Sequence, residues 1–251
     1  ITTNEKLADQ YASKCTLALP LVGADDDVCA SIACTANNKS VTSSSVDAST
    51  AQSNFYGGSH YWSASGDTLN VAQSGNELVF GTGDFTIECW VFDNNGHNGT
   101  SNRCYIFDNR VGGSVTGSNI MVAYVDTHSE WNLYLGSPIL EIVVEVGGAA
   151  IKNKWNHFAV TREGSTVRMF VNGIQIGSST SSINFTNNGI GVGRATDAGY
   201  GWAGYIQDFR VYRGVAKYTD NFVVPSRSPD ILPDTPSGVS GSSKLTKITD
   251  G

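Results

Sequence analysis

The chain has 251 residues, 16% of them charged, and its 16 Lys and Arg against 23 Asp and Glu give a formal net charge of -7. An acidic chain repels a phosphate backbone, so we expect no nucleic-acid partner. No apolar run approaches the ~20 residues that span a bilayer, and the N-terminal ITTNEKLADQ lacks a basic and hydrophobic signal segment, so we expect no insertion into a membrane.

The composition favours an all-β chain. The sequence contains 28 Gly but only 6 Pro and 2 Met, and its charged fraction lies well below the ~25% of an average soluble domain. This suits many short strands joined by tight turns, and β-sandwiches of that kind reach ~200 to 250 residues as one domain.

Three regions differ in character along the chain. We expect residues 1–14 to form a short helix or an arm that docks on a neighbour, 15–225 to form the β domain, and 226–251 to form a flexible tail. The segment that begins at Pro225 is rich in Pro and Ser and too polar to build a core, whereas the last residues are mildly apolar, as the first strand of a following domain would be. The missing initiator Met favours a processed product or a piece of a longer polypeptide.

Alternating apolar and polar residues between clusters of Gly, Asn, Asp and Ser predict antiparallel strands throughout. The predicted strands are 15–21, 39–46, 54–62, 68–72, 84–93, 103–109, 119–125, 131–135, 139–146, 155–162, 166–172, 188–193 and 203–212.

Residues 155–173, WNHFAVTREGSTVRMFVNG, carry the clearest hairpin pattern. Two alternating runs flank a turn at 163–165, and apolar residues occupy every second position from Val167 to Val171. Asn172-Gly173 then marks another tight reversal.

The segment GYIQDFRVYRG, residues 204–214, alternates as well. Strict alternation places on one face Tyr205, Phe209 and Val211, and on the other Ile206, Arg210 and Tyr212. We expect Trp62, Trp90, Trp131 and Trp155, which all fall within predicted strands, to pack in the core.

Five cysteines, Cys15, Cys29, Cys34, Cys89 and Cys104, cannot all pair with one another. Cys29 and Cys34 are spaced so that they could close a short loop, and the redox compartment decides whether any disulfide forms.

The hairpin, the segment FGTGDFTIECWVF (Phe80 to Phe92) and the segment GYIQDFRVYRGVAKY (Gly204 to Tyr218) together resemble the laminin G-like branch of the concanavalin A-like lectin/glucanase superfamily. In amino-acid sequence they are most similar to laminin G-like domains of marine bacteriophage structural proteins. The resemblance implies an all-β jelly-roll β-sandwich of two antiparallel sheets, with ligand sites on the concave face or on rim loops. The superfamily includes glycan-binding lectins, calcium-dependent adhesion modules and glycoside hydrolases, and the fold alone does not choose among them.

The hydrolase members carry an ExDxE motif on one strand, whereas this chain has EIVVE, with Val143 in the central position. By strand rise, Glu141 and Glu145 are about 13 Å apart, and a retaining mechanism needs carboxyl groups ~5 to 5.5 Å apart. The four His residues show no metal-protease or zinc spacing. We therefore expect a protein that is not an enzyme.

Calcium is the cofactor that the resemblance suggests, since this cation takes six to eight oxygen ligands. Asp108 and Asn109 follow the strand CYIF, where pentraxin-like relatives place ligands, and Asp197 lies on a later loop. These three residues are the candidate calcium ligands.

Glycan sites combine aromatic rings, which pack against the apolar faces of sugars, with polar groups that bind hydroxyls. The candidates lie on two loops, because functional residues concentrate on loops. They are Trp202, Tyr200, Arg194 and Asp197 in the loop ATDAGYGW and before it, and His97, Asn94 and Asn95 in the loop DNNGHNGTSNR.

These observations predict a non-catalytic adhesion or surface module of a virion (a tail, fibre or capsid decoration) or of a secreted assembly, located on a virion or outside the cell. Its expected partners are cell-surface glycans. The alternative is a protein–protein assembly module that binds other copies or structural proteins of the same assembly and no sugar. A glycoside hydrolase of the glucanase branch is a further alternative.

Overall fold

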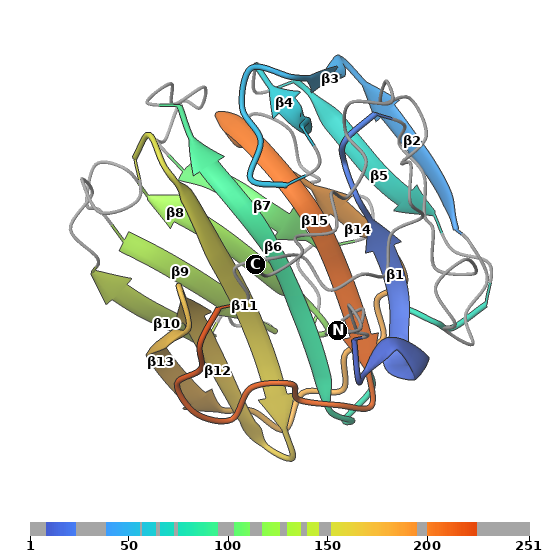
Figure 1. Ribbon diagram of the computed structural model, residues 1–251. Helices are drawn as coiled ribbons and strands as arrows, with labels where there is room; N and C mark the ends of the chain where they lie inside the picture. Colours follow the sequence, from blue (N-terminus) through green and yellow to red (C-terminus); the bar gives the residue numbers. More distant parts are fainter. Residues whose placement is uncertain are drawn as a thin grey trace, which may run out of the picture.

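The structure is a computed structural model, and it describes residues 9–23, 39–55, 57–63, 66–72, 75–94, 103–110, 117–125, 130–136, 140–145, 152–194 and 200–224. Within these residues the chain forms two antiparallel sheets that stack as a sandwich (Figure 1). This is the jelly-roll β-sandwich that the sequence predicts. No helix of the described part is long and apolar enough to cross a bilayer.

The first layer, called here the eight-stranded sheet, has the described strand order β13-β12-β11-β6-β15-β4-β3, with β1 paired to β15. Its strands are β1 (Cys15–Leu19), β3 (Val46–Ser49), β4 (Ser59–Trp62), β6 (Phe85–Asp93), β11 (Trp155–Glu163), β12 (Thr166–Val171), β13 (Ile174–Thr180) and β15 (Gly204–Arg213). A 3-10 turn, η1 (Ala12–Lys14), precedes β1.

The second layer, the seven-stranded sheet, has the described order β10-β9-β8-β7-β14-β5-β2. Its strands are β2 (Ser40–Ser44), β5 (Thr68–Ala72), β7 (Arg103–Asp108), β8 (Ile120–Val125), β9 (Glu130–Leu135), β10 (Leu140–Glu145) and β14 (Ile190–Val192). Every predicted strand range overlaps a strand of the structure.

One large apolar core fills the space between the sheets. Trp131 of the seven-stranded sheet stacks on Phe158 of the eight-stranded sheet, with ring centroids 4.9 Å apart. Trp62 and Trp131 lie in this core, as predicted. Trp90 and Trp155 do not: they are half-buried, and alternation along β6 and β11 turns them to the outer face of the eight-stranded sheet.

A β-bulge in β15 changes the faces that strict alternation predicts for that strand. The register shifts between Gln207 and Arg210, where Asp208 has a φ of 56°. Ile206 therefore lies in the core together with Phe209, whereas Tyr205 is on the outer face, against the prediction.

Two strands were not predicted as such. Ser45, with a φ of 59°, separates β2 in one sheet from β3 in the other. The strand β13 follows the reversal at Asn172-Gly173, which the sequence does predict, but its residues are mostly exposed and lack a regular apolar period because β13 is an edge strand.

Two segments cross the outer face of the eight-stranded sheet beyond its strands. Residues 214–224, called here the strap, run from the end of β15 to the turn before β13, where the Phe222 amide donates to the Gly173 carbonyl at 2.8 Å. Residues 9–14 pack beside β15 through Asp9. The expected tail 226–251, and residues 1–8 of the expected arm, lie outside the described residues.

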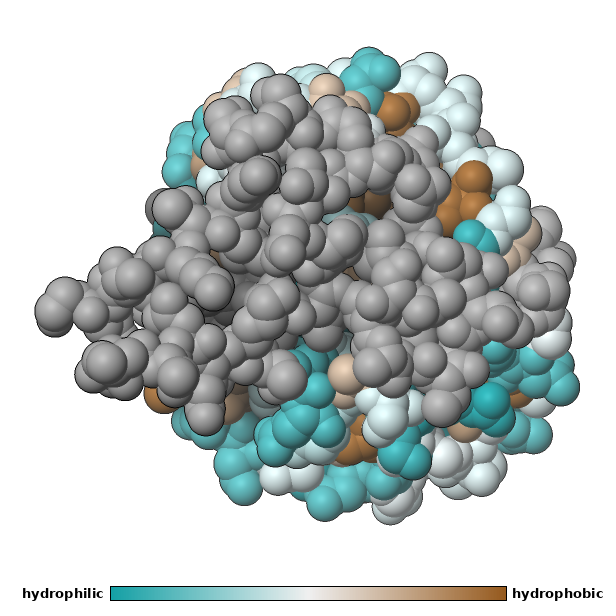
Figure 2. All heavy atoms as spheres, turned by 45° about the vertical axis from the view of Figure 1, so that its right-hand side comes forward, coloured by the Kyte–Doolittle hydropathy of each residue, from teal (hydrophilic) through white to brown (hydrophobic). Residues whose placement is uncertain are grey.

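On the face of the molecule that Figure 2 shows, the described surface is mostly polar. In the space-filling view of Figure 2, the hydrophobic residues show as small separate patches among hydrophilic ones. Of the large hydrophobic residues described, the exposed ones are Ile174 and Val223.

Candidate functional site

The outer face of the seven-stranded sheet carries a second group of packed side chains, apart from the core. In β9, Trp131, Leu133 and Leu135 belong to the core. Alternation therefore turns Asn132 and Tyr134 to the outer face. These two side chains are hydrogen-bonded, with Asn132 Nδ2 donating to the Tyr134 hydroxyl at 2.9 Å.

Neighbouring strands add the rest of this group. Tyr105, Met121 and Tyr134 form an apolar cluster separate from the core, and Tyr200 packs against it. The ring of Tyr105 lies 6.3 Å from that of Tyr134 and 6.1 Å from that of Tyr200. We call Tyr105, Met121, Asn132, Tyr134 and Tyr200 the tyrosine site.

Tyr200 is the half-buried member of the tyrosine site, whereas Tyr105 is 6% and Tyr134 2% exposed. Tyr200 is therefore the member of the tyrosine site that is most accessible to solvent. Aromatic walls around a few polar groups are the usual lining of a small-molecule site.

A buried ion pair flanks the tyrosine site. Asp108 lies directly opposite Met121 in the β7–β8 pairing, which in turn lies opposite Tyr134. Arg110 donates to both oxygens of Asp108: its backbone amide to Oδ1 at 2.8 Å, and its guanidinium to Oδ2 at 2.8 and 2.6 Å. The Arg110 guanidinium is thus hydrogen-bonded to the Asp108 carboxylate, which the sequence suggests as a calcium ligand.

The second calcium candidate, Asn109, also uses its side-chain oxygen internally, since Oδ1 accepts the backbone amide of Ile120 at 2.7 Å. The third, Asp197, lies outside the described residues. No group of three or more His, Cys, Asp or Glu side chains in the described part is placed to hold a metal ion.

The predicted glycan residues are distributed unevenly around one rim. Arg194 and Gly201 form a backbone bridge, which brings Arg194 next to Tyr200. The Asn94 amide donates to the Ala203 carbonyl at 3.1 Å, so that exposed Asn94 reaches the same rim from β6. His97, Asn95 and Asp197 lie outside the described residues.

Trp202 is placed differently from what we expected of a sugar-stacking residue. Its side chain is 1% exposed and belongs to the core, and its backbone amide donates to the Gly193 carbonyl at 2.7 Å. Its ring packs in the core between the sheets and not on the outer face of the seven-stranded sheet, so we do not include Trp202 in the tyrosine site.

Tyr105, Asn132 and Tyr134 are not among the predicted site residues, because they fall within strands and the prediction places ligand contacts on loops. The signal was present: in WNLYL the large apolar residues alternate with an amide and a phenol. That pattern indicates a strand whose second face is not simply solvated.

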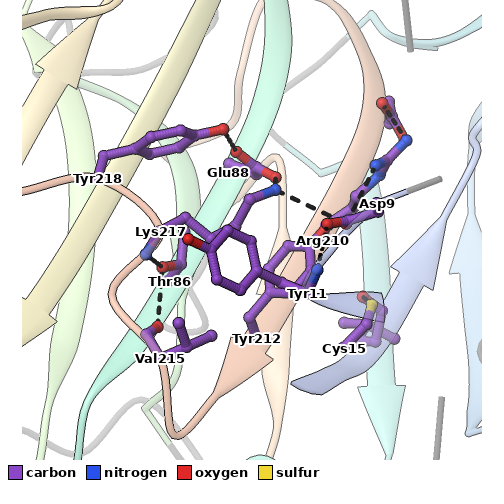
Figure 3. A network of polar contacts seen from close by, with 12 residues as sticks. Asp9, Tyr11, Cys15, Thr86, Glu88, Arg210, Tyr212, Val215, Lys217 and Tyr218 are labelled. Atoms are coloured by element: carbon purple, nitrogen blue, oxygen red, sulfur yellow. Dashed lines mark hydrogen bonds and ion pairs between the residues drawn. The ribbon is translucent and has the colours of Figure 1, made fainter. Parts of the chain in front are cut away.

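A second cluster of titratable groups lies on the outer face of the eight-stranded sheet (Figure 3). Its centre is Glu88 of β6, 5% exposed. Oε1 accepts from Lys217 Nζ at 2.5 Å, Oε2 accepts from the Tyr218 hydroxyl at 2.7 Å, and His157 Nε2 lies 3.5 Å from Oε2.

The cluster continues into the N-terminal segment. Lys217 Nζ lies 3.8 Å from Asp9 Oδ2, and the Tyr212 hydroxyl donates to the same carboxylate. Arg210 forms two hydrogen bonds to Asp208, of 2.6 and 2.7 Å. Polar side chains from three strands thus connect Asp9 and the strap to the eight-stranded sheet.

Burial alone would raise the pKa of Glu88, but Lys217, His157 and Arg210 hold that pKa well below its usual value. Burial and the neighbouring Glu88 carboxylate raise the pKa of Tyr218. Both oxygens of Glu88 accept hydrogen bonds from the protein, so neither is turned outward to a ligand. We interpret this cluster as a set of contacts that hold the strap on the eight-stranded sheet, and not as a ligand site.

The two stacked antiparallel sheets define the class of protein as an all-β sandwich domain. The chain belongs to the concanavalin A-like lectin/glucanases superfamily, whose laminin G-like family model matches residues 63–217, more than half of its length. No curated protein sequence matches the chain.

Three solved structures illustrate the similarity. The binding domain of botulinum neurotoxin serotype D has a TM-score of 0.63 and 15% identity, over 84% of this chain and 50% of that one. A structure of botulinum neurotoxin type C, whose cell entry depends upon interaction with two ganglioside molecules, has a TM-score of 0.59 and 16% identity, over 81% and 49%. Domain 4 of AbnA, a GH43 extracellular arabinanase from Geobacillus stearothermophilus, in complex with arabinotriose, has a TM-score of 0.52 and 13% identity, over 88% and 98%.

The chain spans about half the length of the neurotoxin binding domains that it matches. At these identities the similarity establishes the fold alone.

Proposed function

We propose that the chain is a non-catalytic adhesion module that binds glycans at the tyrosine site. The observation that carries the proposal is the position of Tyr105, Tyr134 and Tyr200 around a buried amide on an outer sheet face. Tyrosine rings present an apolar body and a polar tip, which suits a sugar ring with its apolar faces and its fringe of hydroxyls. The arabinotriose complex of a similarly folded domain supports glycan binding as the function.

The proposal separates two sides of the sandwich. The tyrosine site occupies the outer face of the seven-stranded sheet, whereas the strap and residues 9–14 cover part of the outer face of the eight-stranded sheet. The tyrosine site therefore lies on the opposite outer face from the strap and residues 9–14, and we expect a ligand at the tyrosine site to leave those segments in place.

A printed glycan array, read with labelled protein, tests this function. We expect wild-type protein to bind a subset of the glycans and Tyr200→Ala to lose most of that signal. Tyr61→Ala is the matched control, because Tyr61 is also half-buried but packs on Tyr205 in the other sheet. Equal loss in both variants, or no change in Tyr200→Ala, contradicts the site.

The setting of the module belongs to the proposal as well. The segments Phe80 to Phe92 and Gly204 to Tyr218 resemble laminin G-like domains of phage structural proteins. This resemblance supports a location on a virion or in a secreted assembly, with attachment to cell-surface glycans as the function. Immunogold labelling of virus particles or secreted assemblies from the source organism tests this location. Label confined to the interior of cells contradicts it.

A hydrolase remains the alternative with a specific observation behind it. The pairing of β10 with β9 places Glu141 opposite Tyr134 and Val143 opposite Asn132 in backbone register, beside the tyrosine site. Incubation with the glycans that bind, followed by chromatography, distinguishes the two functions. We expect no products, and products that disappear in Glu141→Gln would establish the hydrolase.

A further inference from the structure

Asn132 has a polar end that the protein leaves unused. The residue is 4% exposed, and its Nδ2 donates to the Tyr134 hydroxyl at 2.9 Å. Its Oδ1 is buried and has no hydrogen-bond partner in the described structure. A buried polar atom without a partner destabilises the folded state, and each case calls for an explanation such as a ligand.

The chemistry of the amide limits what the ligand can be. The Tyr134 hydroxyl can donate or accept, so whichever way the amide of Asn132 lies, one of its two ends bonds Tyr134 and the other stays unpaired. A hydroxyl group satisfies either end, because it both donates and accepts. A carboxylate only accepts, and an ammonium only donates.

The charges near Asn132 do not favour an ionic ligand. Asp108 and Arg110, beside Met121, are paired with each other at 2.6 Å. Glu130 lies two residues before Asn132 in β9, and the chain as a whole carries -7. At Asn132 an anionic sugar would meet this negative balance, because Arg110 is already paired with Asp108 and Arg194 lies at the rim beside Tyr200.

We infer that Asn132 is the specificity-determining residue of the tyrosine site and that the site takes an uncharged sugar, one of whose hydroxyls completes the hydrogen bonding of the buried amide. The inference rests on the proposed glycan-binding function. The tyrosine rings hold the sugar by its apolar faces, and Asn132 selects a hydroxyl at one position.

The test compares two buried asparagines. Asn132→Leu keeps the approximate volume and removes the unpaired atom. Asn156→Leu is the matched control in the eight-stranded sheet, because Asn156 is 1% exposed and fully engaged: it donates to the Lys154 carbonyl at 3.0 Å and accepts from Asn172 at 2.9 Å.

The readouts are thermal unfolding and calorimetric affinity for the neutral oligosaccharide that gives the strongest array signal. We expect Asn132→Leu to weaken binding about tenfold or more, as loss of one hydrogen bond to a buried polar group does, without lowering the melting temperature. We expect Asn156→Leu to lower the melting temperature and to keep the affinity. A purely structural Asn132 would show the reverse pattern.

The outcomes separate the two claims. An array with no signal on any glycan overturns the proposed function and the inference with it. An array on which only sialylated or sulfated glycans bind, or an Asn132→Leu variant with wild-type affinity, overturns the inference and leaves the proposed function standing. Asn132→Asp, which adds a charge at nearly constant shape, gives a second variant, and unchanged affinity for the neutral probe would again overturn the inference.

Discussion

Lys217 of the strap donates to Glu88 of the central strand β6 at 2.5 Å, with both side chains 6% exposed. This contact joins two segments that are far apart in the sequence, and it lies on the opposite outer face from the tyrosine site. Because each charge is removed from water, neither group is stable there without the other.

We therefore expect Lys217→Met to lower the free energy of unfolding by about 3 kcal/mol, since it removes the closest cation from the buried Glu88 carboxylate. Urea denaturation measures this. The control is Arg168→Met, which breaks the exposed pair with Glu163 and should change stability by about 0.5 kcal/mol or less. Equal effects in the two variants would show that burial does not set the strength of the Lys217 contact.

The depressed pKa of Glu88 predicts acid sensitivity. A carboxyl group whose pKa is lower in the folded than in the unfolded state stabilises the protein above the unfolded value, ~4.3, and this stabilisation is lost as pH falls further toward the folded-state pKa. The stability difference between wild type and Glu88→Gln should therefore be constant near neutral pH and shrink below about pH 4.3. A difference that stays constant down to pH 2 contradicts the assignment.

Tyr218 predicts the opposite dependence at high pH, because its pKa is raised by burial and by Glu88. The neutral phenol is the favoured form in the folded state, so its contribution is complete below the unfolded value, ~10, and is lost as pH rises above it. We expect Tyr218→Phe to flatten the fall of stability between about pH 10 and 11. An unchanged slope in thermal melts over that range would contradict this role.

Two glycines test how closely the strap lies on the sheet. Gly173 has a φ of 78°, and a Cβ there would come 2.0 Å from the Phe222 carbonyl oxygen, whereas Gly164 has a φ of 57° and open space. Both alanine variants carry the strain of a left-handed residue, about 1 to 2 kcal/mol. Gly173→Ala should be less stable than Gly164→Ala by about a further 2 kcal/mol, from the clash. Equal losses would mean that the strap moves aside freely.

Trp202 and Tyr200 are close in sequence and opposite in role. Trp202→Ala should cost about 3 to 5 kcal/mol, as removal of a large core side chain does, whereas Tyr200→Ala should cost about 1 kcal/mol. Guanidinium unfolding curves of the two variants check this. A larger loss of stability in Tyr200→Ala than in Trp202→Ala would contradict the assignment of Trp202, and not Tyr200, to the core.

The strands could be predicted from the sequence because most of them alternate cleanly between core and solvent. The hairpin 155–173 is the clearest case: its two strands pair from Phe158 with Val171 to Glu163 with Thr166. Alternation failed where the backbone breaks the period. Asp208, in a left-handed conformation, shifts the register of β15 and exchanges the faces of Tyr205 and Ile206.

The candidate site could be predicted only in part. Tyr200 and Arg194, which border a loop, are predicted residues that the structure places in the tyrosine site or next to it, but Trp202 has the same local signal and lies in the core. Whether an aromatic residue beside a loop points inward depends on the opposite sheet, which no local pattern contains. Tyr105, Asn132 and Tyr134 come together only through the pairing of β7, β8 and β9.

Backbone amide chemical shifts, recorded while a neutral oligosaccharide selected on the array is titrated into the isotope-labelled protein, test the central claim most directly. We predict that the shifts concentrate on Tyr105, Asn132, Tyr134 and Tyr200, while those of Glu88 and the strap stay in place. Shifts confined to the eight-stranded sheet, or no shifts at saturating sugar, would contradict glycan binding at the tyrosine site.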